Sequence, residues 1–216
     1  MERHRGPGQN SAGSRGSAPL ITELVVATGN RHKVEEIRAI LADLPVAVRS
    51  LAEFPGAPEV VEDGATYREN ALKKARSAAK FTGKPALADD TGLEVDALGG
   101  QPGLYAARFA GAGCTFQDNV RKLLCLLNGT PSSRREARFV CVVALVDPNG
   151  REQVVEGELR GRITESQAGS GGFGYDPVFY VPAVGKTLAE LTAEEKNRIS
   201  HRRRALDKAR AIILAN

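Results

Sequence analysis

One hairpin in the second half of the chain limits the folds that the sequence can adopt. Residues 138–146 are apolar after the first position, the turn sequence Asp-Pro-Asn-Gly follows at 147–150, and residues 152–164 return as a second strand. Both arms are longer than the average strand. A hairpin joins antiparallel strands, so this pair cannot belong to an all-parallel sheet.

Strand-like and helix-like segments alternate along the rest of the chain. A buried-type strand at 23–28 leads into a helix, a short strand follows near 46–49, and a loop rich in proline and acidic residues spans 55–63. Residues 98–111 have the composition of a glycine-rich loop or lid. Helix starts are indicated by capping residues at Thr66 with Glu69, Thr192 with Glu195, and Ser200, and residues 115–127 have a helical pattern of apolar positions. The pattern predicts an α/β fold with a mixed sheet.

Charge is concentrated outside the expected domain. Residues 1–20 are rich in Gly, Ser and Arg, and three arginines against one glutamate give them +2 of the formal +4. They have no apolar segment of the secretory type, so we expect a disordered N-terminal extension at 1–20 and one domain at 21–216. The weakly charged body predicts no nucleic-acid partner. No apolar run approaches the length of a membrane span, which predicts no membrane association.

Cysteine usage indicates the compartment. Cys114, Cys125 and Cys141 form no CxxC pair and leave an odd count. Cys125 and Cys141 lie in apolar periodic segments, where we expect them to act as small core residues. This pattern fits a reducing compartment and argues against structural zinc. We therefore predict a cytoplasmic protein.

Two adjacent carboxylates are the first candidate for chemistry. Asp89-Asp90 ends an apolar run and precedes Thr91-Gly92, which is typical of a turn. A strand ending this way would bring negative charge to the mouth of a sheet, where Mg²⁺ is held by one or two carboxylates and substrate phosphates. On this window alone, an ordinary solvated turn is an equal alternative. Neighbouring strand residues point to opposite faces, so the two carboxylates should have different roles. Glu62 or Asp63 would complete the acidic group.

The junction at residues 28–33, Thr-Gly-Asn-Arg-His-Lys, is a candidate phosphate cradle. Gly29 allows the backbone to approach an anion, the helix that follows offers free N–H groups, and Lys33 lies one turn inside it. The spacing is not that of a P-loop. The alternative is that Asn30 is a plain N-cap followed by an exposed lysine.

Two further segments could recognise a base. Residues 169–174 read GxGxxG, but they lead into the strand-like segment 178–181 and do not open a helix, which excludes a dinucleotide fingerprint. Phe173 could stack on a base and Asp176 could hydrogen-bond to it, or the segment is a turn with a core phenylalanine. Lys196, His201 and Arg202 cluster where one helix gives way to the next, and the alternatives there are a structural histidine and a solvated basic face.

Together these segments resemble the inosine/xanthosine triphosphate pyrophosphatase family from about Leu24 to the C-terminus. The resemblance rests on Thr28-Gly-Asn-x-x-Lys33, Glu69-Asn-Ala71, Ala88-Asp-Asp-Thr-Gly-Leu93, Leu98-Gly-Gly-x-Pro-Gly103, Gly171-Gly-Phe-Gly-Tyr-Asp-Pro177 and Ser200-His-Arg202. It implies an elongated mixed sheet with two α/β lobes flanking a central active-site cleft, and a homodimer. It also implies Mg²⁺-dependent hydrolysis of ITP, dITP and XTP to monophosphate and pyrophosphate, which clears them from the nucleotide pool and keeps them out of DNA and RNA.

The resemblance also implies roles for individual residues. Asp90 is similar to the general base and metal-associated carboxylate, with Asp89 and Glu62 as further metal ligands. The residues similar to the phosphate-binding set are Thr28, Gly29, Asn30, Arg31, His32, Lys33 and Lys74. Those similar to the nucleoside-binding set are Thr91, Phe173, Gly174, Tyr175, Asp176, Lys196, His201 and Arg202. Two positions depart from the family pattern: Thr91 stands where many relatives have serine, and Val61-Glu62-Asp63 replaces Glu-Glu-Thr, so Asp63 stays an alternative ligand.

Elementary chemistry agrees with these roles. A triphosphate carries about four negative charges, and phosphoryl transfer depends mainly on positioning and charge stabilisation. Donors from His201, Arg202 or the backbone would distinguish a 6-oxo purine from ATP. The sequence identifies no device that rejects GTP. A hydrolase of modified pyrimidine nucleotides and a non-enzymatic nucleotide- or RNA-binding protein stay as alternatives.

Overall fold

The computed structural model describes residues 21–215. The predicted extension at 1–20 lies outside the described residues. The strands are β1 Glu23–Val26, β2 Ala47–Ser50, β3 Ala86–Val95, β4 Pro102–Gly103, β5 Glu136–Val146, β6 Glu152–Ile163, β7 Phe179–Val181 and β8 Lys186–Thr187. The helices are α1 Arg31–Ile40, α2 Tyr67–Thr82, α3 Phe116–Leu126, α4 Ala193–Ile199 and α5 His201–Ala215.

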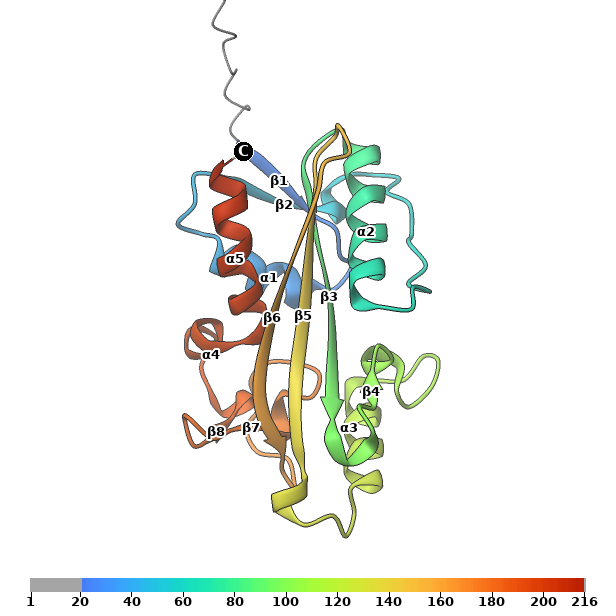
Figure 1. Cartoon of the computed structure of the whole chain (residues 1–216), viewed down its shortest axis with the longest axis vertical. Coiled ribbons are helices and arrows are strands. Elements are labelled where there is room, and N and C mark those ends of the chain that lie inside the picture. The colour runs from blue at the N-terminus through green and yellow to red at the C-terminus, as the bar shows by residue number, and fades with distance from the viewer. Residues whose placement is uncertain (1–20, 216) are drawn as a thin grey trace, which may run out of the picture.

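One mixed sheet forms the centre of an elongated molecule (Figure 1). Its order is β2-β1-β3-β5-β6-β7-β8, with β4 paired to β3. β1 pairs in parallel with β2 and β3, whereas β3, β5 and β6 are antiparallel neighbours along the long axis. The predicted hairpin is therefore the β5–β6 pair, and the α/β class with a mixed sheet is confirmed.

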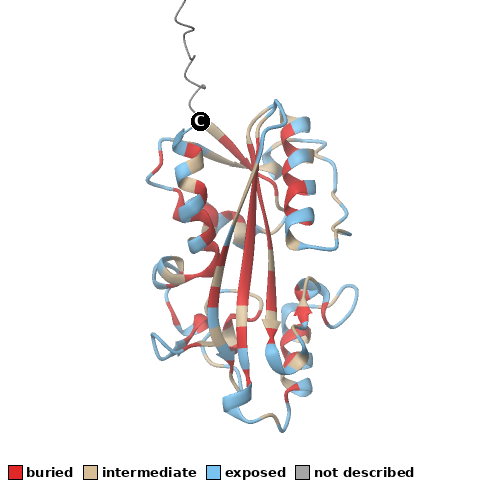
Figure 2. Cartoon of the chain, in the orientation of Figure 1, coloured by how far each residue is buried: buried red, intermediate tan, exposed pale blue. Residues whose placement is uncertain are grey.

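Helices cover the sheet in two lobes. In the upper lobe of Figure 1, α1 and α5 cover one face of the sheet and α2 covers the other. In the lower lobe, α3 packs with β7 and the far ends of β3, β5 and β6 around a separate apolar cluster. The buried residues follow the long strands and the inner faces of the helices (Figure 2). Burial on both faces explains why β5 is almost continuously apolar.

The predicted end of β3 at Asp89-Asp90 is wrong. The strand continues to Val95 because β5 supplies a pairing partner along its whole length. Gly92 is an extended strand residue, and the glycine is needed for another reason. A Cβ there would lie 2.2 Å from the Tyr67 hydroxyl and 2.6 Å from the Gly103 carbonyl oxygen. Gly92 therefore allows β3 to pack closely against Tyr67 of α2 and Gly103 of β4.

The helix caps follow the prediction with one difference. The Thr192 box is complete, with Thr192 and Glu195 bonding each other's backbone N–H groups. At the start of α2, the Thr66 hydroxyl accepts from the Glu69 N–H at 3.1 Å, but the Glu69 carboxylate accepts from the N–H of Ala65. Both helices begin where the capping residues predicted.

The cysteines divide between core and surface. Cys141 on β5 is fully buried, as predicted, whereas Cys125 is exposed. Leu123 on α3 and Leu127 at its C-cap are buried one turn apart, and Cys125 between them falls on the opposite side of the helix. Within residues 21–215, no helix combines the length and hydropathy that crossing a membrane requires.

Candidate active site

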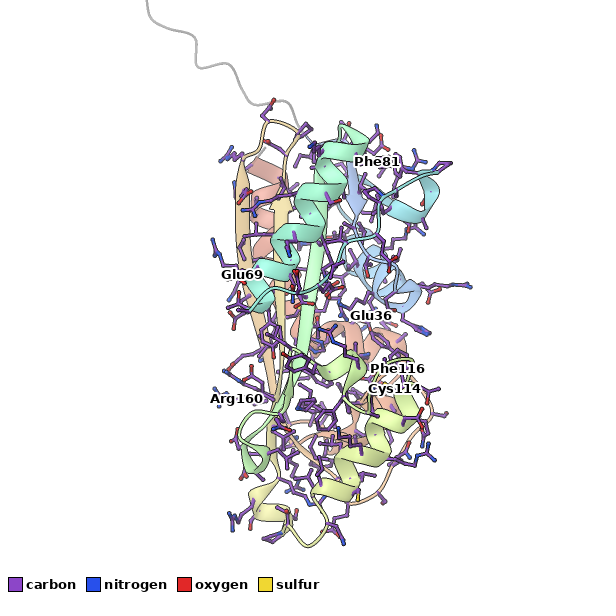
Figure 3. The ribbon with its side chains drawn as sticks, turned by 90° about the vertical axis from the view of Figure 1, so that its right-hand side faces the viewer. Glu36, Glu69, Phe81, Cys114, Phe116 and Arg160 are labelled. Carbon is purple, nitrogen blue, oxygen red and sulfur yellow. The ribbon has the colours of Figure 1, made fainter. Side chains whose placement is uncertain are left out.

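A cavity of about 570 Å³ lies where the two lobes meet. In Figure 3, Glu36 on α1 and Phe116 at the start of α3 lie on the two sides of the lobe boundary. The predicted site residues in its wall are Thr28, Gly29, Asn30, Lys33, Glu62, Lys74, Asp90, Thr91, Phe173, Gly174, Tyr175, Asp176, Lys196, His201 and Arg202. Three predicted residues, Arg31, His32 and Asp89, do not line it. The fold therefore brings together segments that are distant in sequence.

One end of the cavity is acidic. The Lys74 ammonium on α2 lies 3.0 Å from Glu62 Oε2 and 3.3 Å from Asp90 Oδ1, and it donates to the Asp89 carbonyl oxygen at 2.8 Å. Asn70 donates to the other Asp90 oxygen at 3.3 Å. Burial raises the pKa of Asp90 to about 6, because the opposing effect of Lys74 and Lys33 is smaller. Two carboxylates thus share one ammonium at the edge of the cavity.

Asp89 lies on the other face of β3, as the strand period predicted. Its carboxylate is fully buried and contacts Arg202 Nη2, Lys33 Nζ and the Thr91 hydroxyl at 3.0, 3.0 and 2.9 Å. Burial opposes ionisation, yet Lys33 and Arg202 outweigh it and lower the pKa of Asp89. The structure does not bring Asp89 to the cavity wall beside Asp90. Its contacts fit a residue that holds Lys33 and Arg202 in place.

The β1–α1 junction has the expected N-cap, but Lys33 is not the exposed lysine of that alternative, because its side chain is 15% exposed and pairs with Asp89. Asn30 is the N-cap of α1, and its side chain accepts from the N–H groups of His32 and Lys33 at 3.0 and 3.3 Å. Gly29 nevertheless faces open space, because a Cβ there would meet no atom within 4 Å. Arg31 points to solvent and pairs with Glu35 on the helix surface. The capped turn therefore leaves room for a ligand beside it.

The other end of the cavity is aromatic. The Phe173 ring stacks on His32 at 5.1 Å and is tilted against Phe116 at 6.0 Å, and the Lys196 ammonium lies 4.6 Å from its centroid. The buried Asp176 carboxylate accepts from the Phe173 N–H at 2.8 Å, which fixes the loop that carries the ring. The GxGxxG segment is followed by a short 3₁₀ turn and β7, as predicted.

Cations at this end are held by buried carboxylates. Lys196 pairs with Glu36 at 2.7 Å and with Asp176 at 2.5 Å. Arg202 pairs with Glu36 as well as with Asp89, and it is 1% exposed. Burial, reinforced by Arg202 and Lys196, lowers the pKa of His201 well below its ordinary value, so its ring is neutral near pH 7. His201 stacks on Phe139 at 4.6 Å.

Sequence reasoning missed several residues of this region. Glu36 was not recognised, because it lies within a helical segment that has no motif of its own. Its position next to the buried Ile37 and Ile40 could have indicated a partly buried carboxylate. Arg108 and Phe116 come from the predicted loop or lid and the helix after it, and both line the cavity. Within residues 21–215, no group of three or more His, Cys, Asp or Glu side chains could hold a metal ion.

Comparison with known proteins gives consistent matches over nearly the whole described chain. Residues 24–212 match the sequence profile of the Ham1 family. A protein named dITP/XTP pyrophosphatase from Desulforamulus reducens is 54% identical over 191 residues, covering 88% of this chain and 95% of that protein. One of the same name from Geobacter sulfurreducens is 54% identical, covering 86% and 94%. The solved structure of a HAM1 protein from Coxiella burnetii superposes with a TM-score of 0.81 at 42% identity, covering 89% and 98%.

Proposed function

The chain belongs to the Ham1 family, and on that premise we propose that it is a nucleoside triphosphate pyrophosphatase for deaminated purine nucleotides. It would hydrolyse ITP, dITP and XTP to the monophosphate and pyrophosphate and so keep them out of DNA and RNA. The proposed reaction is the one stated in the relatives' name, dITP/XTP pyrophosphatase. The main observation behind the proposal is a single cavity with two chemically different ends. Carboxylates and lysines line one end, and at the other end the Phe173 ring lies close to Lys196 and Arg202.

The acidic end fits a divalent cation. Glu62 and Asp90 present hard oxygen ligands to the same space, and the Lys74 ammonium in contact with both supports a preference for positive charge there. Mg²⁺ usually takes one or two carboxylates and completes its coordination with phosphates and water. We propose that these two residues hold it, in preference to Asp89 on the far face and Asp63, whose carboxylate pairs with Lys73. When bound, Mg²⁺ would neutralise charge on the phosphate oxygens.

The protein's own groups would position the phosphates and the attacking water. Thr28, Gly29 and Asn30 offer a capped helix start to the phosphates, and the ammonium groups of Lys33 and Lys74, each paired with a carboxylate, line the same cavity as hydrogen-bond donors. Asp90 borders the cavity and is proposed to accept the proton of a water that attacks the α-phosphorus. Pyrophosphate then leaves with the β- and γ-phosphates.

The aromatic end would bind the base. Phe173 is proposed to stack on the purine, with Gly174 and Tyr175 beside it and Thr91 near the sugar. Lys196, Arg202 and backbone N–H groups are donors that suit a 6-oxo group, which accepts hydrogen bonds where an amino group donates them. His201 is buried against Phe139 and could contribute through one ring nitrogen.

A panel of nucleoside triphosphates with Mg²⁺, scored for pyrophosphate release, tests the proposal. We expect ITP, dITP and XTP to be hydrolysed far faster than ATP, GTP and pyrimidine nucleotides. Reaction in ¹⁸O-labelled water should place the label in the nucleoside monophosphate. Preference for a modified pyrimidine, binding without turnover, or label in orthophosphate would each refute it.

Assembly and location are part of the same proposal. We propose a cytoplasmic homodimer, as the family resemblance and the unpaired cysteines suggest. Light scattering coupled to size-exclusion chromatography measures the mass in solution, and a monomer at micromolar concentration would contradict the dimer. Fractionation of cells expressing the full chain tests the location.

A further inference from the structure

Most positive charge in the cavity is already neutralised by the protein. The cations that line it are Lys33, Lys74, Arg108, Lys196 and Arg202. Their ion-pair partners, at the cavity or directly behind it, are Glu36, Glu62, Asp89, Asp90 and Asp176. Lys33, Lys74, Lys196 and Arg202 each contact at least one of these carboxylates. Those four cations therefore carry no surplus charge for a substrate that brings about four negative charges.

Arg108 differs from the other four. Within the described part of the chain, no ion pair joins Arg108 to a carboxylate. Its guanidinium donates to the backbone carbonyl oxygen of Glu62 at 3.3 Å and lies 5.4 Å from the centre of the Tyr105 ring. The first contact crosses from the 104–111 loop of the lower lobe to the segment that carries the proposed metal ligand. Arg108 thus holds a free positive charge at the acidic end of the cavity.

The loop fixes the backbone of Arg108 and leaves its side chain free to turn. Tyr175 donates to the Ala106 carbonyl oxygen at 2.9 Å, and Asn119 donates to that of Ala107 at 3.1 Å. Phe109 is buried in the lower core. The Arg108 side chain is exposed between these anchors. Because a carbonyl is a weaker partner than an ionised oxygen, a phosphate would readily replace it.

We propose that Arg108 binds the terminal phosphates of the substrate, as the cation that the protein leaves unneutralised for them. This inference rests on the proposed function. It adds to that function a residue that distinguishes a triphosphate from a monophosphate by binding the terminal phosphates. A planar guanidinium suits bidentate contact with phosphate oxygens. On binding, Arg108 exchanges the Glu62 carbonyl for phosphate and closes the cavity from the lower lobe.

Inhibition by fragments of the substrate separates this role from others. We would compare wild type, Arg108→Ala, Arg108→Lys and Arg121→Ala, measuring kcat and KM for dITP and inhibition constants for inorganic tripolyphosphate and for dIMP. Arg121 is the control, because it is an exposed arginine of the same lobe that pairs with Asp118 and does not line the cavity. Unfolding temperatures are recorded for all four proteins.

We expect Arg108→Ala to weaken tripolyphosphate inhibition by about 10- to 100-fold, the range for a charged hydrogen bond, and to leave dIMP inhibition within about twofold. Arg108→Lys should recover part of the loss, and Arg121→Ala should match wild type. Equal effects on tripolyphosphate and dIMP, or equal behaviour of Arg108→Ala and Arg121→Ala, would overturn the inference. Failure of the wild type to hydrolyse dITP or XTP refutes the proposed function instead, and calorimetric titration of tripolyphosphate still tests Arg108 in that case.

Discussion

Replacing Arg202 by methionine should destabilise the protein before it affects specificity. The side chain is 1% exposed and joins α5 to Asp89 on β3 and to Glu36 on α1. Removing one partner of a buried ion pair costs about 3–5 kcal/mol, because the remaining charge is left buried. Here each carboxylate keeps one cation, Asp89 with Lys33 at 3.0 Å and Glu36 with Lys196 at 2.7 Å. We therefore expect a loss near the lower limit, about 3 kcal/mol.

Urea denaturation followed by circular dichroism measures this loss, and for a chain of this size it corresponds to a fall in Tm of about 6–12 °C. Arg210→Met is the matched control on the same helix. Arg210 pairs with the exposed Asp43, so its loss should stay within about 1 kcal/mol. In a cycle with Asp89→Asn, the double mutant should be more stable than the sum of the single losses by at least about 1 kcal/mol. A loss below about 1 kcal/mol for Arg202→Met would refute this account of the ion-pair network.

Three further predictions address the cavity and the strand beneath it. Asp90→Asn should keep the fold and nucleotide binding while turnover of dITP falls by about 10²–10⁴, and retention of a tenth of wild-type turnover would remove Asp90 as the base. Phe173→Ala should lower kcat/KM for ITP, XTP and GTP alike, by about 1–3 kcal/mol of stacking energy, whereas a loss confined to one base would assign the ring another role. Gly92→Ala should destabilise the protein by about 1–3 kcal/mol, because the new Cβ meets Tyr67 and Gly103. An unchanged unfolding temperature would show that the Tyr67 ring and the Gly103 backbone can both move aside.

Local patterns in the sequence were sufficient for much of the fold. The hairpin at β5–β6 followed from two apolar runs and an Asp-Pro-Asn-Gly turn, and it excluded a parallel sheet. The strand period separated Asp89 from Asp90, and the structure places them on opposite faces of β3. The sequence pattern gave the wrong end for β3, because that end depends on a neighbouring strand. Asp-Asp-Thr-Gly resembles a turn by itself, but in the structure β5 pairs with it and the strand continues.

The ion pairs of Arg202 with Asp89 and Glu36 could not be predicted from the sequence. Asp89 and Arg202 are 113 residues apart, and Glu36 and Arg202 are 166 apart. Their contact depends on how α1 and α5 pack on the same face of the sheet, which no local spacing encodes. The sequence marked Arg202 as a candidate for base recognition. The structure adds that its guanidinium is already shared by two carboxylates, so any contact to a base must compete with them.

The sharing of strands between the lobes determines how a nucleotide can enter. β3 pairs with β5 from Ala86 opposite Val146 to Val95 opposite Ala137, and β5 pairs with β6 over the same span. Because the same strands run through both lobes, the lobes can move relative to each other only by a bend or twist of this continuous sheet. The loops at 55–65 and 104–115, which supply other parts of the cavity wall, lie outside these ladders and can move separately. Entry of a nucleotide therefore depends on bending of the shared strands and on these two loops, and not on a flexible linker between two domains.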